Sequence, residues 1–140
     1  MRGWALTAGV VLASCAPSPA APPTRIDGPA IVSLNPCSDA VLAEVADPAQ
    51  ILGISSYSQN PASSSMDLAT ARQFRAVSGS LEEVLALRPD LVIADPFLPA
   101  ATAAALARLG IPVERVAIAT SVAESRAQVL RLAELAGHGA

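Results

Sequence analysis

Cys37 is the side chain of this sequence best suited to act as a nucleophile. It follows a short apolar run and precedes a helical pattern, and a helix N-terminus favours the thiolate form of a cysteine. A nucleophilic cysteine also needs a base, and the sequence has one histidine, His138, close to its last residue. Three interpretations of Cys37 stay open: a catalytic thiol, a thiol that lines a pocket, and a buried space-filling side chain.

Acidic side chains occupy three further positions that chemistry could use. Glu82 and Glu83 open a predicted helix after Ser80. There they either complement the helix dipole or form an exposed acidic knob for a basic partner. Asp95 follows a buried apolar run, and it is either a turn-former before Pro96 or a ligand contact.

Two aromatic side chains fall in predicted loops at strand ends. A tyrosine has an apolar body and a polar tip, which suits a ligand surface better than a core position. We therefore place Tyr57 in a pocket, and Phe97 by the same argument.

The positions of these residues in the fold follow from the predicted strands and helices, which appear as apolar runs separated by helical patterns. Uninterrupted runs of this length are typical of strands buried on both faces of a parallel sheet. The predicted strands are 30–34, 51–55, 75–77, 91–94 and 113–118. Between them, helix caps and apolar periodicity predict helices over Ser38–Ala46, Leu81–Leu87, Pro99–Leu109 and Ser121–Ala136, with Ser38 as the first cap. A further short helix is expected between the second and third strands.

The alternation predicts an α/β fold with three layers and a mostly parallel, Rossmann-like sheet. In such sheets ligands bind outside the carboxyl ends of the strands. This rule selects four loops that should line one edge of the sheet: 35–38, 56–58, 78–80 and 95–97.

Composition excludes several classes of protein. With 52% hydrophobic and 15% charged residues, the chain is not disordered. A net charge of −3 without lysine offers no basic surface for nucleic acid. One histidine and two cysteines are too few for a zinc site of those ligands, so we expect no resident metal or cofactor.

The N-terminal segment has the pattern of an export signal. Arg2 precedes a short apolar run that ends in Leu12-Ala13-Ser14-Cys15, a tetrapeptide typical of lipoprotein signals. Ordinary cleavage near Ala20 is the alternative. We expect a signal peptide over residues 1–14, a proline-rich tether over 15–29, and an α/β lobe over 30–140. Lipid on Cys15 would anchor the chain in the cell envelope.

Several segments together resemble a known family. The chain is similar to the N-terminal lobe of periplasmic binding proteins of the helical-backbone type, which serve ABC importers of cobalamin, ferric siderophores and haem. The resemblance covers about residues 30–137, with Ser78–Ala94 as its most specific part. The matching segments are Ile31–Leu42, Ile51–Ser58, Ser78–Ala94 and Leu109–Val113.

The resemblance implies roles for individual residues. In this family two lobes enclose the ligand at strand ends and helix starts, and an acidic residue docks on the membrane permease. The docking residue falls on Glu82, with Glu83 beside it, and a pocket tyrosine falls on Tyr57. The second lobe is missing from this sequence, so we expect a truncated chain. The implied ligand contacts are Asn35, Pro36, Cys37, Ser38, Tyr57, Ser58, Ser78, Gly79, Asp95 and Phe97.

The leading hypothesis is therefore a solute-binding component of an ABC importer that captures a metal chelate, without bond chemistry. The tryptophans that cobalamin-binding members place around the corrin have no counterpart after the signal segment. Two alternatives come from other classes. One is a thiol-dependent enzyme on a doubly wound fold that uses Cys37. The other is an interaction module that uses only the surface around Glu82.

Overall fold

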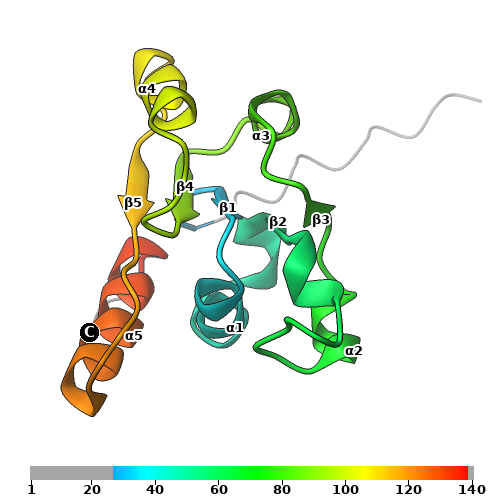
Figure 1. The fold of residues 1–140 in the computed structure, drawn as a ribbon, viewed down its shortest axis with the longest axis vertical. Helices are drawn as coiled ribbons and strands as arrows, with labels where there is room; N and C mark the ends of the chain where they lie inside the picture. The colour runs from blue at the N-terminus through cyan, green and yellow to red at the C-terminus, as the bar shows by residue number, and fades with distance from the viewer. Residues whose placement is uncertain (1–26, 139–140) are drawn as a thin grey trace, which may run out of the picture.

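The computed structural model describes residues 27–138, and these form alternating strands and helices (Figure 1). The predictions for the signal peptide, for Cys15 and for most of the tether lie outside the described residues. The five strands are β1 (Ile31–Ser33), β2 (Ile51–Ser55), β3 (Ala76–Val77), β4 (Leu91–Ala94) and β5 (Val113–Arg115).

Within residues 27–138, five α-helices and two short 3₁₀ helices accompany the strands. The α-helices are α1 (Pro36–Val45), α2 (Leu68–Ala71), α3 (Leu81–Leu87), α4 (Ala100–Arg108) and α5 (Val122–Leu135). The 3₁₀ helices are η1 (Pro48–Gln50) and η2 (Ser56–Gln59). The predicted order of elements is confirmed.

The sheet is parallel throughout, with strand order β3-β2-β1-β4-β5. The chain builds outward from β1 to β3, and then returns to place β4 on the other side of β1. The order therefore reverses between β1 and β4, where Ile31 pairs with Leu91 and Ser33 with Ile93. At such a reversal the connections leave toward opposite faces, which opens a crevice at the carboxyl ends of the two strands.

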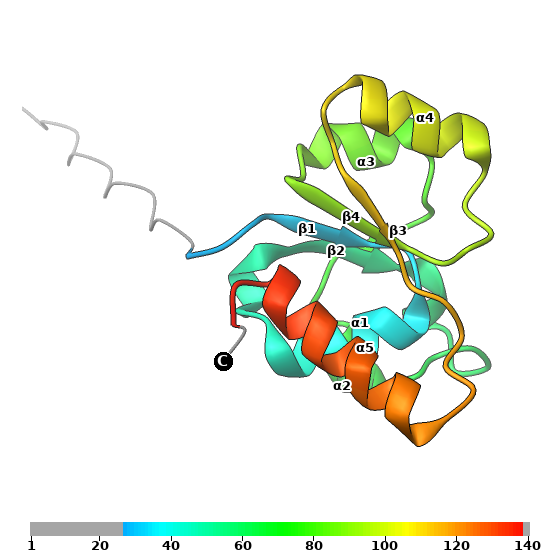
Figure 2. The same ribbon diagram turned by 90° about the vertical axis from the view of Figure 1, so that its left-hand side faces the viewer.

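Helices cover both faces of the sheet, which gives the predicted three layers (Figure 2). Helices α1, α2 and α5 lie on one face, and α3 and α4 lie on the other. Side chains alternate along each strand, so Ile31 and Ile93 pack with Leu42 and Leu132, whereas Val32 and Val92 pack with Val84 and Leu106. Both faces of the central strands are apolar because both are buried.

Two predicted boundaries differ from the structure by more than one residue. Helix α1 begins at Pro36 rather than after Ser38, because Asn35 accepts a hydrogen bond from the Cys37 N–H and caps the helix. Strand β5 ends at Arg115 rather than at Ile118. Its apolar continuation did not pair beyond Val116, whose N–H donates to Ala94 O, because β4 ends there.

The caps of α3 and α5 follow the sequence prediction. Ser80 accepts from the Glu83 N–H, and Ser121 accepts from the Glu124 N–H. Both helices thus start at the carboxyl edge of the sheet, beside the loops that were selected for ligand binding. Figure 1 looks directly onto this edge.

Candidate functional site

A cavity of about 550 Å³ lies at the reversal of strand order, between the ends of β1 and β4. Its walls come from α1, α5, the β4–α4 loop and the segment 116–119. Its volume is in the range of small-molecule sites. Five of the ten predicted ligand contacts line it: Asn35, Cys37, Ser38, Asp95 and Phe97.

The α1 side of the cavity is polar because the helix begins there. The Cys37 side chain is exposed, and its Sγ lies 3.7 Å from Ser65 Oγ. Ser38 also lines the cavity, but it is buried and its Oγ has no hydrogen-bond partner among the described residues. The Oδ1 of Asn35 accepts from the Cys37 N–H in the helix cap.

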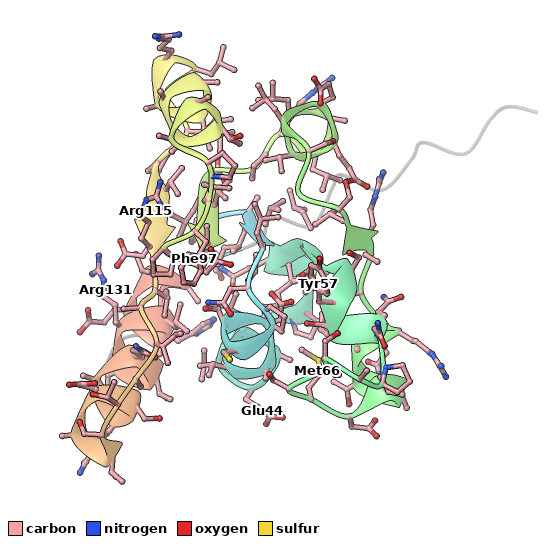
Figure 3. The ribbon with its side chains drawn as sticks, viewed as in Figure 1. Glu44, Tyr57, Met66, Phe97, Arg115 and Arg131 are labelled. Atoms are coloured by element: carbon pink, nitrogen blue, oxygen red, sulfur yellow. The ribbon has the colours of Figure 1, made fainter. Side chains whose placement is uncertain are left out.

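The β4 side of the cavity presents an aromatic ring. Phe97 is 79% exposed, and its N–H donates to Asp95 Oδ1 at 2.7 Å. Arg115 of β5 reaches the same turn and donates to Pro96 O and Leu98 O. In Figure 3 the ring of Phe97 lies between α1 and α5, at the edge that faces the viewer. Asp95 is thus both a turn-former and a cavity residue.

The other predicted contacts do not line this cavity. Tyr57 lies on the η2 turn, 63% exposed, on the other side of α1 from Phe97 (Figure 3). Ser58 is buried, so the structure places it inside the fold rather than at the surface. Ser78 and Gly79 follow β3, at the far end of the same edge, and Pro36 is the first residue of α1.

Asp39 is the residue that the sequence analysis missed. It lies in α1 with no exposed surface, and its Oδ2 accepts from the Ser55 N–H at 2.9 Å and from Ser58 Oγ at 2.6 Å. Burial raises the pKa of Asp39 to about 7, and the hydroxyls of Ser33 and Ser58 and the N–H of Ser55 only partly oppose this rise. Asp39 lies three residues before Leu42, so the two share the inward face of the helix, and this spacing could have indicated its burial from the sequence.

The β3–α3 loop separates the roles of the two adjacent glutamates. Glu83 Oε2 accepts from both the N–H and the Oγ of Ser78, at 2.7 and 2.6 Å. These hydrogen bonds hold the pKa of Glu83 below its ordinary value. Gly79 has a φ of 88°, which a glycine adopts without strain, so the loop can turn back onto Glu83. Glu82 is exposed and is the glutamate left facing solvent.

The fold separates Cys37 from the histidine that was considered as its base. His138 follows α5, and its Nε2 lies 3.3 Å from Oε1 of Gln50, which directly precedes β2. Gln50 is at the amino edge of the sheet, opposite the edge that carries Cys37. Cys37 and the imidazole of His138 therefore lie at opposite edges of the sheet. Within residues 27–138 no group of three or more potential metal ligands occurs.

Comparison with protein families gives a match over residues 31–140 to the family model described as "Periplasmic binding protein". The chain belongs to the periplasmic binding protein family. The predicted resemblance is thereby confirmed at the level of the family. No curated protein matches the chain.

Solved structures of other periplasmic binding proteins share the fold. A periplasmic haem-binding protein from Pseudomonas aeruginosa aligns with a TM-score of 0.64 at 23% identity, over 79% of this chain and 39% of that chain. The periplasmic vitamin B12-binding protein BtuF of Vibrio cholerae aligns with a TM-score of 0.57 at 24% identity, over 79% of this chain and 41% of that chain.

The periplasmic haem-binding protein RhuT from Roseiflexus sp. RS-1 gives a TM-score of 0.57 at 22% identity, over 80% of this chain and 43% of that chain. This chain thus matches less than half of the length of each of these three proteins.

In the part described by the structure, no helix is long and apolar enough to cross a bilayer.

Proposed function

We propose that this chain forms the N-terminal lobe of the solute-binding component of an ABC importer, and that the cavity between β1 and β4 is its part of the ligand site. The cavity itself carries the proposal, because it lies at the one place where the strand order reverses. Its lining is mostly apolar, with a few hydroxyl and amide groups, as in sites that orient a small molecule.

The proposed ligand is a metal chelate of the size of haem, cobalamin or a ferric siderophore. Support comes from the aromatic side chains Phe97 and Tyr57, which stand exposed at the same edge of the sheet. An exposed aromatic face suits a planar, largely apolar ring system better than it suits water. The three solved structures compared above carry haem or vitamin B12 in their names.

Equilibrium titration tests this proposal directly. Hemin, cyanocobalamin and a ferric hydroxamate are titrated into the chain while absorbance and thermal unfolding are recorded. A true ligand at 100 times its dissociation constant should stabilise the fold by about 2.7 kcal/mol. If none of the three probes changes either signal, ligand capture by this lobe is ruled out for these chelates, and an interaction module becomes the better description.

Two neighbouring positions on α5 provide a matched pair of variants. Val129 lines the cavity, whereas Leu130 is 57% exposed and does not. Val129→Arg should fill the cavity with a charged side chain and weaken binding at least tenfold, about 1.4 kcal/mol. Leu130→Arg should leave binding unchanged. Equal losses in both variants would place the ligand elsewhere.

Glu82 is the proposed contact for the permease. It is exposed in the first turn of α3, whereas Glu83 is already engaged by Ser78. An exposed carboxylate at this place can pair with a basic side chain on the membrane subunit, and such pairing weakens with salt. Glu82→Lys should reduce binding to permease in vesicles at low salt, without affecting chelate binding. A parallel loss of chelate binding would make Glu82 a folding residue instead.

A lipid tether on Cys15 completes the proposal and concerns residues outside those described. The intact mass of the protein extracted from its membrane fraction tests it. A mass increased by diacylglycerol and acyl chains on Cys15 supports envelope anchoring. A mature protein that begins after residue 15, without lipid, would show ordinary secretion.

A further inference from the structure

The turn that presents Phe97 is held by a side chain from another strand. Arg115 Nη1 donates to Pro96 O at 2.8 Å, and its Nη2 donates to Leu98 O at 3.2 Å. The two carbonyl groups flank Phe97 on either side in the sequence. A planar guanidinium can reach both at once because its donors form a rigid fork, which a lysine ammonium does not have.

A second contact holds the same turn from within. The Phe97 N–H donates to Asp95 Oδ1 at 2.7 Å, which closes a local turn directly after β4. Together with the two bonds from Arg115, three hydrogen bonds fix the backbone around one residue. The ring that this backbone carries is 79% exposed and lines the cavity. Packing does not explain why the backbone around Phe97 is held by three hydrogen bonds, because the ring itself buries little surface.

The charged residues next to Arg115 interact with other partners. Glu114, the preceding residue on β5, forms an ion pair with Arg131 of α5 at 3.0 Å. Successive side chains of a strand point to opposite faces, so Glu114 and Arg115 serve different faces of the sheet. Asp95 is engaged by Phe97, and Arg115 itself does not line the cavity.

We propose that Arg115 is a positioning residue, which holds the 95–98 turn so that the ring of Phe97 stands at the rim of the cavity. Arg115 does not touch the ligand; it acts through Phe97. The expected effect on ligand binding rests on the proposed function. The expected effect on the structure of the turn rests on the hydrogen bonds alone.

Limited digestion with chymotrypsin tests the structural part without any ligand. Cleavage after Phe97 is followed by mass spectrometry relative to cleavage after Phe74, which is partly buried against the core. In Arg115→Ala the rate of cleavage after Phe97 should rise about tenfold, because a loosened turn fits the active site of the protease more readily. The Phe74 rate reports global unfolding, so only a rise in the ratio of the two rates counts.

Arg131→Ala is the matched control. It removes an arginine from the same side of the molecule and breaks the ion pair with Glu114, but it does not contact the 95–98 turn (Figure 3). Its ratio of Phe97 to Phe74 cleavage should equal that of the unmodified protein. If Arg115→Ala and Arg131→Ala give the same ratio, Arg115 does not hold the turn and the proposal is overturned.

Binding of hemin and cyanocobalamin tests the consequence for the site. Phe97→Ala and Arg115→Ala should each weaken binding about tenfold, and the double variant should be no weaker than Phe97→Ala alone. Arg115→Lys should fall between, because a single ammonium nitrogen keeps the charge but lacks the fork of separate nitrogens that spans the two carbonyl groups. Additive losses in the double variant would overturn the proposal, since Arg115 would then act independently of Phe97. If the unmodified protein binds neither probe, the proposed function fails for these ligands, and the digestion ratio still decides the role of Arg115.

Discussion

The carboxylate of Asp39 in α1 lies 2.6 Å from the hydroxyl of Ser58, the residue that follows Tyr57 in the η2 turn. The same oxygen accepts from the Ser55 N–H at the end of β2. One buried side chain thus links the first helix to the turn that carries the exposed tyrosine. Its other oxygen, Oδ1, is also buried, and the buried hydroxyl of Ser33 lies beside the same carboxyl group.

The first prediction concerns the pH dependence of stability. Burial raises the pKa of Asp39 to about 7, so the folded protein binds more protons than the unfolded chain between about pH 4 and pH 7. The free energy of unfolding should therefore fall as pH rises, by about 2–3 kcal/mol between about pH 5 and about pH 8. Urea denaturation across this range measures the change.

Asp39→Asn should remove this slope. An amide oxygen can accept from Ser55 and Ser58 as the carboxylate does, and the side chain no longer titrates. The control is Glu44→Gln, an exposed carboxyl on the same helix, which should keep the slope of the unmodified protein (Figure 3). A slope that survives in Asp39→Asn would assign the pH dependence to another group.

The second prediction separates Glu82 from Glu83. Glu83→Ala should lower the melting temperature, because it removes both hydrogen bonds to Ser78 and loosens the loop before α3. The pKa of Glu83 is lowered in the folded state, so its contribution is present above the unfolded value and disappears as pH falls through the folded value. Thermal unfolding at neutral and at acidic pH checks both points.

Glu82→Ala is the counterpart in the same helix turn, and it should leave the melting temperature unchanged because its carboxylate is exposed. If both variants were destabilised alike, the helix dipole rather than the Ser78 contact would explain the effect.

The third prediction concerns Gln50, which is fully buried at the amino edge of the sheet. Its Nε2 donates to Pro29 O and to Ala136 O, and its Oε1 accepts from the Asp47 N–H. The side chain therefore joins the segment before β1 to the end of α5. Gln50→Ala should destabilise the protein by about 3 kcal/mol, because it leaves buried backbone groups without partners.

Chemical denaturation of Gln50→Ala is best compared with Gln73→Ala, a glutamine with an exposed side chain. The latter should change the free energy of unfolding by less than about 0.5 kcal/mol. A loss in Gln50→Ala that is no larger than this would mean that water replaces the glutamine without cost.

The fourth prediction tests how α5 packs on the sheet. Leu132 is 1% exposed and belongs to the core cluster beneath α1 and α5, whereas Leu130 on the same helix is 57% exposed. Leu132→Ala should cost about 2–5 kcal/mol, because it leaves a cavity in a close-packed core. Leu130→Ala should be nearly neutral, since Ala is the better helix former and little surface is lost. Equal effects of the two substitutions in denaturant titrations would show that α5 is not docked as described.

Local patterns in the sequence were sufficient for the elements and their order. The runs 51–55 and 91–94 are strands with the predicted bounds, because short apolar runs bounded by turn residues suit strands that are buried on both faces of a parallel sheet. Caps at Ser80 and Ser121 mark the starts of α3 and α5, because a hydroxyl in that position satisfies a free N–H of the first turn. The start of α1 was misplaced, since Asn35 and Ser38 are both good caps and local rules do not choose between them.

The sequence by itself determined the α/β alternation and the set of loops at one edge, because both depend on periodicity and on short-range turns. Only the tertiary structure decided which of these loops meet. The strand order brings the ends of β1 and β4 together, so Cys37 and Phe97 line one cavity, whereas Tyr57 stands apart. The burial of Asp39 and the reach of Arg115 to the Phe97 turn likewise join residues far apart in the chain. Such contacts depend on how the layers pack, and no local pattern encodes that packing.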